Sequence, residues 1–375
     1  MKILIVPFIV HPKADAAYFL SRSMADVFTA AGMECAICCD PDNTFRQVRV
    51  YPSHLPSHPL FNWGADNRSY EEWMYSQGLL TKNAVLSDTQ DIQDAIADFH
   101  PDLIIAINRP AANIAAKLDK IPCWTVVHPA MYRNAWFPSR CMHGINQALT
   151  QLQTEQELDL KTLYAHSVRR LAFGCLQSAP FPSDANITRI GSMNIEEHRK
   201  TRTNRVCIYL GSLHSRPKTI AKIIEEAFAG APYYVYIWIK GIPAHAYKNL
   251  HYIKEPDSSL INGCSAVIHD GNTYFYNQAM VNGIPQMLIA DHTCMRNYNA
   301  MAAARGHFGV YLYEEDLEMA ALYETYRKLM SDDLYYESAQ KYREMTLHHG
   351  DLTQIHDFTY IDMIDNKAKG AVTVE

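Results

Sequence analysis

Several sequence features are missing from this chain of 375 residues, and each absence excludes a class of protein. No window of about 20 apolar residues occurs, which argues against a membrane-spanning helix. No G-x-G-x-x-G string occurs, which argues against a nicotinamide or flavin dinucleotide site. The formal net charge is −6, so electrostatics give no reason to expect a nucleic-acid partner. Short-period repeats and low-complexity segments are also absent.

Metal and disulfide patterns are lacking as well. The nine cysteines are scattered, and the nearest approach to a cluster, Cys35, Cys38 and Cys39, lies in an apolar strand-like run where a cysteine acts as a small hydrophobe. Reduced thiols and a cytoplasmic location are therefore expected. The D-x-D string at residues 40–42 is typical of a solvated turn, so no metal is predicted. The apolar segment 1–10 lacks a small-residue cleavage site and is interrupted by Pro7, which favours a first buried strand over a signal peptide.

What the chain does contain is typical of a two-domain α/β protein. A content of 48% hydrophobic residues is enough to build large cores, and the length favours two domains. Apolar strand-like runs alternate with helical patterns in both halves, which predicts parallel sheets with helices on both faces. We expect domains at residues 1–185 and 200–350, joined by a polar, irregular linker within 178–204. The strand-like runs are Ile3–Phe8, Glu34–Cys39, Leu103–Ile107, Trp124–His128, Val206–Leu210, Tyr233–Ile239, Leu250–Ile253, Ala266–Ile268 and Gln286–Ile289.

The segment Ser265–Ile289 is the most informative. It predicts a buried strand, a glycine-containing turn at 269–271, a helix that Gly283 and Pro285 end, and a second strand. A strand followed by such a turn and a helix points backbone N–H groups and the positive end of the helix toward an anion. An ordinary βα turn without a ligand is the alternative, and the spacing alone does not separate the two.

Six blocks, in order along both halves, resemble the UDP-glycosyltransferase superfamily of GT-B nucleotide-sugar glycosyltransferases. Two resemble the family's Asp-Ala-Val-x-x-His-Gly-Gly and Glu-Ala-Leu-x-x-Gly-Val-Pro strings, and the others resemble its strand-then-Gly-Ser opening, its Pro-Gln step, its Pro-Asp-Leu-Val-Val string and its Gly-Ile-Pro string. In this chain the blocks are Cys264–Gly271, Gln278–Pro285, Val206–Ser212, Lys248–Leu260, Pro101–Ile105 and Ile121–Val126.

The resemblance implies a GT-B fold of two doubly wound, Rossmann-like domains that face each other across a cleft. It implies a glycosyltransferase that moves a sugar from a UDP- or dTDP-linked donor to a hydroxyl of a small-molecule or lipid-like acceptor, inverting and without a metal or other cofactor. It also implies that a C-terminal helix, about 352–375, packs back on the first domain; a homodimer is a further possibility. Carried over by motif, the donor-binding residues are Gly211, Ser212, Lys254, Asp257, His269, Gly271, Asn272, Thr273 and Gln278.

Departures from the family pattern fall on base and sugar recognition. Lys254 stands where the family stacks a tryptophan on the nucleobase, and Gln278 replaces the glutamate that holds the ribose. Asp270 replaces the first glycine after the histidine. The Asp-Gln pair that grips the donor sugar aligns near Met295 and Arg296.

The acceptor hydroxyl needs a general base, because its own pKa is far above 7. In the family this base lies between the first strand and the first helix, but its position aligns here with Ala17, which cannot serve. His11 and Asp15 in the same loop are the candidates, and loss of the base is the third possibility. The aromatic segment 51–78 is interpreted either as an acceptor loop or as a surface loop held by its own aromatics.

Two other functions stay open. A nucleotide-sugar epimerase on the same fold would need no acceptor pocket, so the aromatic segment counts against it. A non-catalytic or auxiliary GT-B protein, which binds a nucleotide or a partner subunit, is favoured by the altered base and sugar positions.

Overall fold

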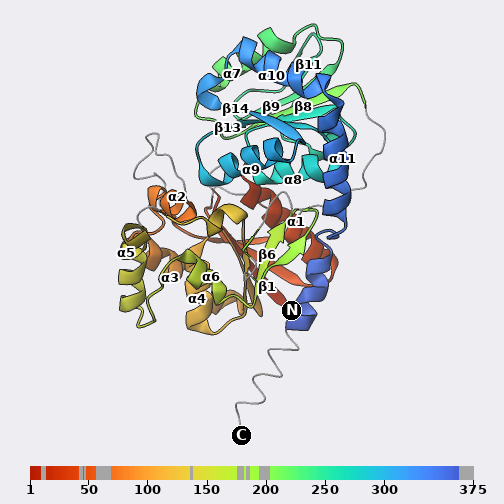
Figure 1. Ribbon diagram of the computed structural model, residues 1–375. Helices are drawn as coiled ribbons and strands as arrows, with labels where there is room; N and C mark the ends of the chain where they lie inside the picture. The colour runs from red at the N-terminus through yellow and green to blue at the C-terminus, as the bar shows by residue number, and fades with distance from the viewer. Residues whose placement is uncertain are drawn as a thin grey trace.

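The computed structural model describes residues 1–9, 14–41, 45, 48–55, 69–135, 138–174, 181–182, 186–193 and 203–362. Its strands form two seven-stranded sheets, one in each half of the chain, with helices packed on both faces (Figure 1). The predicted fold class, two doubly wound α/β sheets, is thereby confirmed. No helix within the described ranges combines the length and apolar character needed to cross a membrane.

The first sheet has the order β3-β2-β1-β4-β5-β6-β7, and all of its strands are parallel. Residues 3–6 of its central strand are completely buried, as expected for an apolar run covered by helices on both sides. The strands are β1 (Lys2–Pro7), β2 (Glu34–Cys39), β3 (Arg49–Pro52), β4 (Leu103–Ile107), β5 (Cys123–Val126), β6 (Arg169–Phe173) and β7 (Thr188–Ile190). The helices are α1 (Ala16–Ala30), α2 (Tyr70–Ser76), α3 (Lys82–Phe99), α4 (Pro110–Asp119), α5 (Pro138–Gln151) and α6 (Leu160–Ala165), with a 3₁₀ turn η1 (Pro129–Tyr132).

The second sheet has the order β10-β11-β9-β8-β12-β13-β14, and only the hairpin of β10 and β11 is antiparallel. Its strands are β8 (Arg205–Leu210), β9 (Tyr234–Ile239), β10 (His245–Tyr247), β11 (Leu250–Tyr252), β12 (Ala266–His269), β13 (Gln286–Ala290) and β14 (Gly309–Tyr313). Its helices are α7 (Pro217–Phe228), α8 (Thr273–Asn282), α9 (Cys294–Arg305), α10 (Met319–Ser331) and α11 (Asp333–Leu347), with 3₁₀ turns η2 (Ser258–Leu260) and η3 (Glu314–Asp316).

The β12–α8 unit forms where the sequence predicted it. Asn272 caps α8 by accepting a hydrogen bond from the Tyr274 N–H at 2.9 Å. Gly283 ends the helix in the left-handed conformation at φ +66°, which a glycine adopts without steric cost. Because the chain crosses from β8 to β9 on one side and returns to β12 on the other, β8 and β12 flank the switch point of the sheet, where open α/β sheets bind ligands.

The two domains share one core. Phe19 of α1 stacks on Tyr274 of α8, with ring centroids 4.4 Å apart. Asn277 of α8 accepts a hydrogen bond from the Met193 N–H at 3.0 Å and donates to the Gly191 carbonyl at 2.7 Å. The second domain is therefore seated against both α1 and the chain that follows β7.

The end of the described chain returns to the first sheet, beside β1, as the blue helix after α11 in Figure 1 shows. Residues 354–362 are helical, and Asp362 accepts hydrogen bonds from the Trp124 indole N–H and the Arg169 Nε, both at 2.8 Å. A carboxylate that is 8% exposed thus ties the C-terminal segment to strands β5 and β6. The predicted domain boundary within 178–204 and the residues after 362 lie largely outside the described residues.

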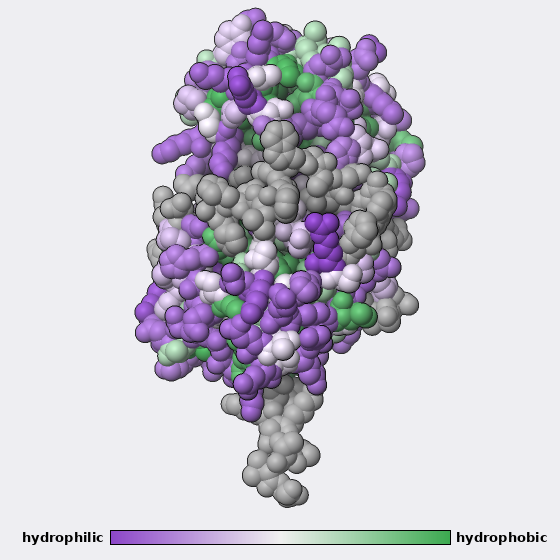
Figure 2. All heavy atoms as spheres, turned by 90° about the vertical axis from the view of Figure 1, so that its left-hand side faces the viewer, coloured by the Kyte–Doolittle hydropathy of each residue, from purple (hydrophilic) through white to green (hydrophobic). Residues whose placement is uncertain are grey.

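Part of the aromatic segment 51–78 is helical rather than loop. Ser69 and Glu72 form a reciprocal capping box at the start of α2, and Tyr70 is fully buried. The sequence interpretation missed this helix because a seven-residue element offers too few turns for a periodic pattern. Residues 56–68 lie outside the described residues. On the face drawn in Figure 2, the coloured residues are mainly hydrophilic, with hydrophobic ones scattered among them.

Candidate active site

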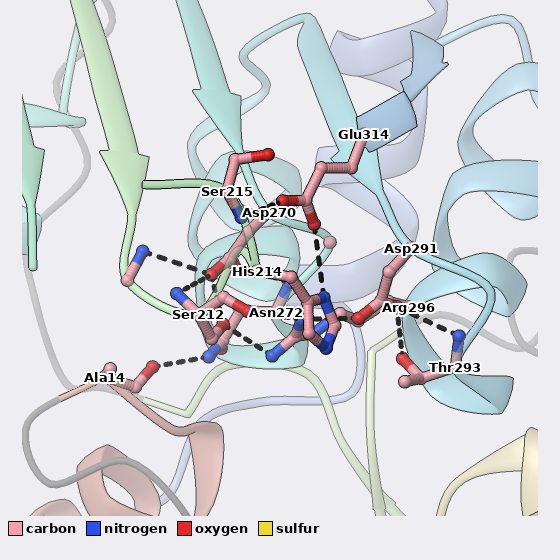
Figure 3. Close-up of polar contacts among 12 residues, drawn as sticks. Ala14, Ser212, His214, Ser215, Asp270, Asn272, Asp291, Thr293, Arg296 and Glu314 are labelled. Carbon is pink, nitrogen blue, oxygen red and sulfur yellow. Dashed lines mark hydrogen bonds and ion pairs between the residues drawn. The ribbon is translucent and has the colours of Figure 1, made fainter. Parts of the chain in front are cut away.

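Four loops meet at the carboxyl ends of β8, β12, β13 and β14 in the second domain (Figure 3). The strands are parallel neighbours, so the residues that follow them gather at one edge of the sheet. Polar side chains fill this edge, and several of them are buried. They are Ser212, His214 and Ser215 after β8, Asp270 and Asn272 after β12, Asp291 and Thr293 after β13, Arg296 at the start of α9, and Glu314 after β14.

Asp270 is at the centre of this cluster and is 1% exposed. Its Oδ2 accepts hydrogen bonds from the Gly211 N–H at 3.2 Å, the Ser212 N–H at 3.1 Å and the Ser212 hydroxyl at 2.5 Å. Its Oδ1 accepts from the Asn272 N–H at 3.2 Å. Residues 211 and 212, which the motif resemblance assigns to donor binding, thus hold a carboxylate of the protein itself.

Arg296 lies beside this carboxylate. Its guanidinium donates to the Ser212 hydroxyl at 2.5 Å, to the Ser212 carbonyl at 3.1 Å and to Asp291 at 2.8 Å. Burial alone would lower the pKa of Arg296, but the nearby carboxylates Asp291, Asp270, Asp15 and Glu314, in falling order of effect, raise it. The cation is therefore permanent, and carboxylates outnumber it within the cluster.

His214 and Glu314 form a second pair at the rim, 3.3 Å apart. Burial works to raise the pKa of Glu314, but hydrogen bonds from His214 and from the Ser215 N–H lower it to about 2. The hydrogen bond to Glu314 in turn raises the pKa of His214. The pair is arranged to hold one negative and one positive charge.

His269 is beside the N-terminus of α8, as predicted, but its ring is completely buried. The Gly271 N–H donates to its Nδ1 at 3.2 Å, so the proton is on Nε2, which donates to the Gln286 side chain at 2.8 Å. Burial lowers the pKa of His269, which keeps the ring neutral. Both ring nitrogens are used inside the domain, so in this arrangement the ordinary βα-turn interpretation describes His269 better than donation to a phosphate.

The first turn of α8 is also occupied, partly from the first domain. The Asn272 side-chain amide donates to the Ala14 carbonyl at 2.7 Å, which seats this residue of the first domain on the helix N-terminus (Figure 3). Asn299 of α9 donates to the Gly271 carbonyl at 3.0 Å and to the Thr273 hydroxyl at 3.1 Å. The Oδ1 of Asn299 is 3.0 Å from the Nε2 of His128, which belongs to the first domain.

Asp15 precedes α1 and is close enough to Arg296 to raise the pKa of that guanidinium. Residues 14 and 15 therefore lie beside the cluster at the domain interface. His11, the other candidate base, lies outside the described residues, so the structure does not compare the two.

The remaining predicted donor residues are spread around the site. Gln278 is 1% exposed, and its Nε2 has no hydrogen-bond partner among the described residues. Lys254 is exposed, and Asp257 caps η2 by accepting from the Ser259 N–H at 2.9 Å. A cavity of about 800 Å³ opens beside this turn, between the two domains. It is lined by residues of α1 (Phe19, Arg22, Ser23, Asp26, Val27, Ala30), of the turn after β11 (Glu255, Pro256, Asp257, Ser258) and by Tyr274, Phe275 and Leu352.

The sequence does not predict the charged network, because the family pattern marks Asp270 and Arg296 only as departures. The available signal was position: Asp270 and Asp291 each directly follow a buried apolar strand, and Glu314 directly follows β14. Among the described residues, no group of three or more His, Cys, Asp or Glu side chains is arranged to hold a metal ion.

The chain is similar to known proteins in sequence over part of its length and in fold over nearly all of it. Residues 249–356 match the family model "Erythromycin biosynthesis protein CIII-like, C-terminal domain". A sequence search among curated proteins found no match.

Among solved structures, the chain is similar to the spinosyn rhamnosyltransferase SpnG, with a TM-score of 0.72 and 15% identity over 96% of this chain and 99% of that one. It is also similar to the glycosyltransferase VinC in complex with dTDP, with a TM-score of 0.66 and 16% identity over 97% and 100% of the two chains. For SsfS6 of Streptomyces sp. SF2575, complexed with thymidine diphosphate, the TM-score is 0.69 at 14% identity over 96% and 99%. The chain thus has the GT-B fold, and the resemblance predicted from its motifs is confirmed.

Proposed function

We propose that this GT-B protein is a glycosyltransferase that moves a sugar from a nucleoside-diphosphate donor to a hydroxyl group of a small-molecule acceptor. One observation carries the proposal. The Gly211–Ser212 amides and the Arg296 guanidinium meet at the switch point of the second sheet, and Asp15 of the first domain is next to Ala14, whose carbonyl accepts a hydrogen bond from Asn272 beside them. This is where the fold is able to hold a leaving phosphate on one side and a base on the other.

The donor side suits a leaving diphosphate. When a glycosidic bond to a nucleotide breaks, negative charge develops on the β-phosphate, and fixed donors aimed at that charge lower the barrier. The amides of residues 211 and 212, the N-terminal end of α8 and the permanent charge of Arg296 are such donors, and they need no metal ion. We assign His269 to shaping the turn rather than to contacting the phosphate.

The nucleoside side has room for a ligand. The cavity of about 800 Å³ follows β11 at the same edge of the sheet, and its size is in the range of small-molecule sites. Pro256, Tyr274 and Phe275 supply apolar surface for a base, and Glu255 and Asp257 supply acceptors for ribose hydroxyls. This supports Asp257 as a donor-site residue and leaves Lys254 at the rim.

Inversion requires the base and the leaving group on opposite sides of the anomeric carbon. Asp15 fits that requirement, because it comes from the first domain and is close enough to Arg296 of the second to raise the pKa of that guanidinium. His11 stays the alternative base by virtue of its place in the same loop.

The solved structures support a choice of donor and acceptor class. Solved structures show SpnG complexed with thymidine diphosphate and with the spinosyn aglycone, and VinC and SsfS6 complexed with thymidine diphosphate. By analogy we propose a dTDP-linked sugar as the donor ahead of a UDP-linked one, and a natural-product aglycone as the acceptor. The cytoplasmic location and the homodimer stay predictions from the sequence.

A second candidate, a non-catalytic GT-B protein, is favoured by one observation: Asp270 occupies the amides of the phosphate site. The two functions separate experimentally. A catalytic protein hydrolyses or transfers the sugar of a dTDP- or UDP-sugar, whereas an auxiliary protein binds the nucleotide and leaves the sugar intact.

The test is a thermal-shift and calorimetric titration with thymidine and uridine diphosphate at millimolar concentration, followed by an assay of sugar release with the matching nucleotide sugars. Arg296→Met should weaken binding about tenfold, because it removes the charge that faces the phosphate. Arg305→Met, at the exposed last turn of the same helix, is the matched control and should bind as the unmodified protein does. Absence of binding to every nucleoside diphosphate would refute the proposal.

A further inference from the structure

We propose that Asp270 competes with the donor phosphate: its carboxylate occupies the hydrogen-bond donors of Gly211 and Ser212, so a diphosphate binds only when this side chain moves away. The inference rests on the proposed function, because it concerns the same donor site. It assigns Asp270 a part in setting how tightly the donor is held. The family pattern has a glycine at this position, so the motif resemblance gives Asp270 no role.

The contacts of Asp270 are those that an anionic ligand would make. Two successive backbone N–H groups and one hydroxyl converge on a single oxygen, at 3.1–3.2 Å and 2.5 Å. Successive amides in a turn after a strand form a concave anion site, which a carboxylate oxygen or a phosphate oxygen can fill. Because Asp270 is 1% exposed, its carboxylate fills this site inside the protein.

Charge strengthens the competition. Asp15, Asp291 and Glu314 add to Asp270 around the guanidinium of Arg296. A diphosphate that approached Ser212 with Asp270 still in place would meet a like charge within a few ångströms, in a site where water does not screen it. The incoming phosphate and this carboxylate therefore exclude each other.

The arrangement allows exchange without unfolding. Asp270 follows β12, whereas three of its four donors follow β8, so the two partners are on different loops. Rotation of one side chain would free the amides and leave both strands in register. Arg296 would then pair with the phosphate from the position it already occupies next to Ser212.

The experiment compares Asp270→Ala and Asp270→Asn with the unmodified protein, by calorimetric titration with thymidine diphosphate and, separately, with inorganic pyrophosphate. Asp270→Ala opens the site, and Asp270→Asn keeps an acceptor of the same shape but removes the charge. Glu314→Gln is the matched control, because it removes a charge from the same cluster without touching the Gly211 or Ser212 amides. Circular dichroism and melting temperature establish that each variant is folded.

We expect Asp270→Ala to bind both ligands at least about tenfold more tightly, Asp270→Asn to gain less, and Glu314→Gln to gain under about threefold. If Asp270→Ala does not fold, a gain in Asp270→Asn that exceeds the gain in Glu314→Gln supports the inference in its place. Equal affinity of the unmodified protein and both Asp270 variants for thymidine diphosphate overturns the inference and leaves the proposed function standing.

The two proposals fail in distinguishable ways. Tighter pyrophosphate binding by Asp270→Ala, with no binding of any nucleoside diphosphate, supports the anion site and refutes the proposed function. No binding of either ligand by any of these proteins overturns both.

Discussion

Glu71 of α2 should make the protein less stable as the pH rises, and replacing it with glutamine should remove that loss. The side chain is 1% exposed, and its Oε2 has no hydrogen-bond partner within the described part of the chain. Burial, the largest influence, together with Asp159 outweighs Lys161 and two backbone N–H donors and raises the pKa of Glu71 from 4.5 to about 7. Below pH 7 the folded protein therefore holds Glu71 mainly as the protonated acid.

The magnitude follows from linkage. Between pH 4.5 and 7 the folded state binds more protons than the unfolded state, so stability falls as the pH rises through this window. A shift of this size corresponds to about 3 kcal/mol in total, of which about 2.5 kcal/mol falls between pH 5 and pH 8. For a chain of 375 residues, the unfolding entropy is about 0.8 kcal/mol/K, so this loss is ~3 °C in melting temperature.

The assay is differential scanning fluorimetry of the unmodified protein and Glu71→Gln at pH 5 and pH 8. The melting temperature of the variant minus that of the unmodified protein should rise by about 3 °C from the lower to the higher pH. Glu155→Gln, which replaces an exposed carboxylate of the same domain, should show no such rise. A difference for Glu71→Gln that is the same at both pH values would show that the buried acid is not protonated in the folded state.

Three further predictions test other parts of the structure. Burial lowers the pKa of His128 to about 4, so the contribution of His128 to stability should fall by about 2 kcal/mol from pH 7 to pH 5, and His128→Gln should remove that contribution in the same fluorimetric comparison. Arg109→Met leaves Asp88 buried without its ion-pair partner and should lower the free energy of unfolding, measured with urea, by about 3–5 kcal/mol. The double variant Arg109→Met/Asp88→Leu should recover part of that loss, and no recovery would argue against the ion pair. Asp362→Ala should increase proteolysis of the C-terminal segment, because it removes the contact to Trp124, and unchanged proteolysis would mean that the segment is held elsewhere.

Fold class was accessible from the sequence because it is encoded locally. Apolar runs such as 3–6 are long enough to identify buried strands, and Gly283 with Pro285 marks the end of a helix by backbone chemistry alone. The alternation of such elements specifies a parallel sheet, since parallel strands require crossover helices. The short helices α2 and α6 were not predicted, because they have too few residues to show a helical pattern of apolar positions.

The place of the site was also accessible, because the loops that follow parallel strands meet at one edge of a sheet whatever their sequences are. The hydrogen-bond partner of each polar group at that edge could not be predicted from the sequence. The side-chain partner of His269 is 17 residues further along the chain, and the partners of the Asp270 Oδ2 are 58 and 59 residues before it. No local pattern specifies which carboxylate reaches which amide across such separations. The sequence by itself therefore determined the two α/β domains and the edge where chemistry is possible. Only the tertiary structure decided that the Asp270 carboxylate occupies the N–H groups of Gly211 and Ser212, because that depends on how β8, β12 and α9 pack together.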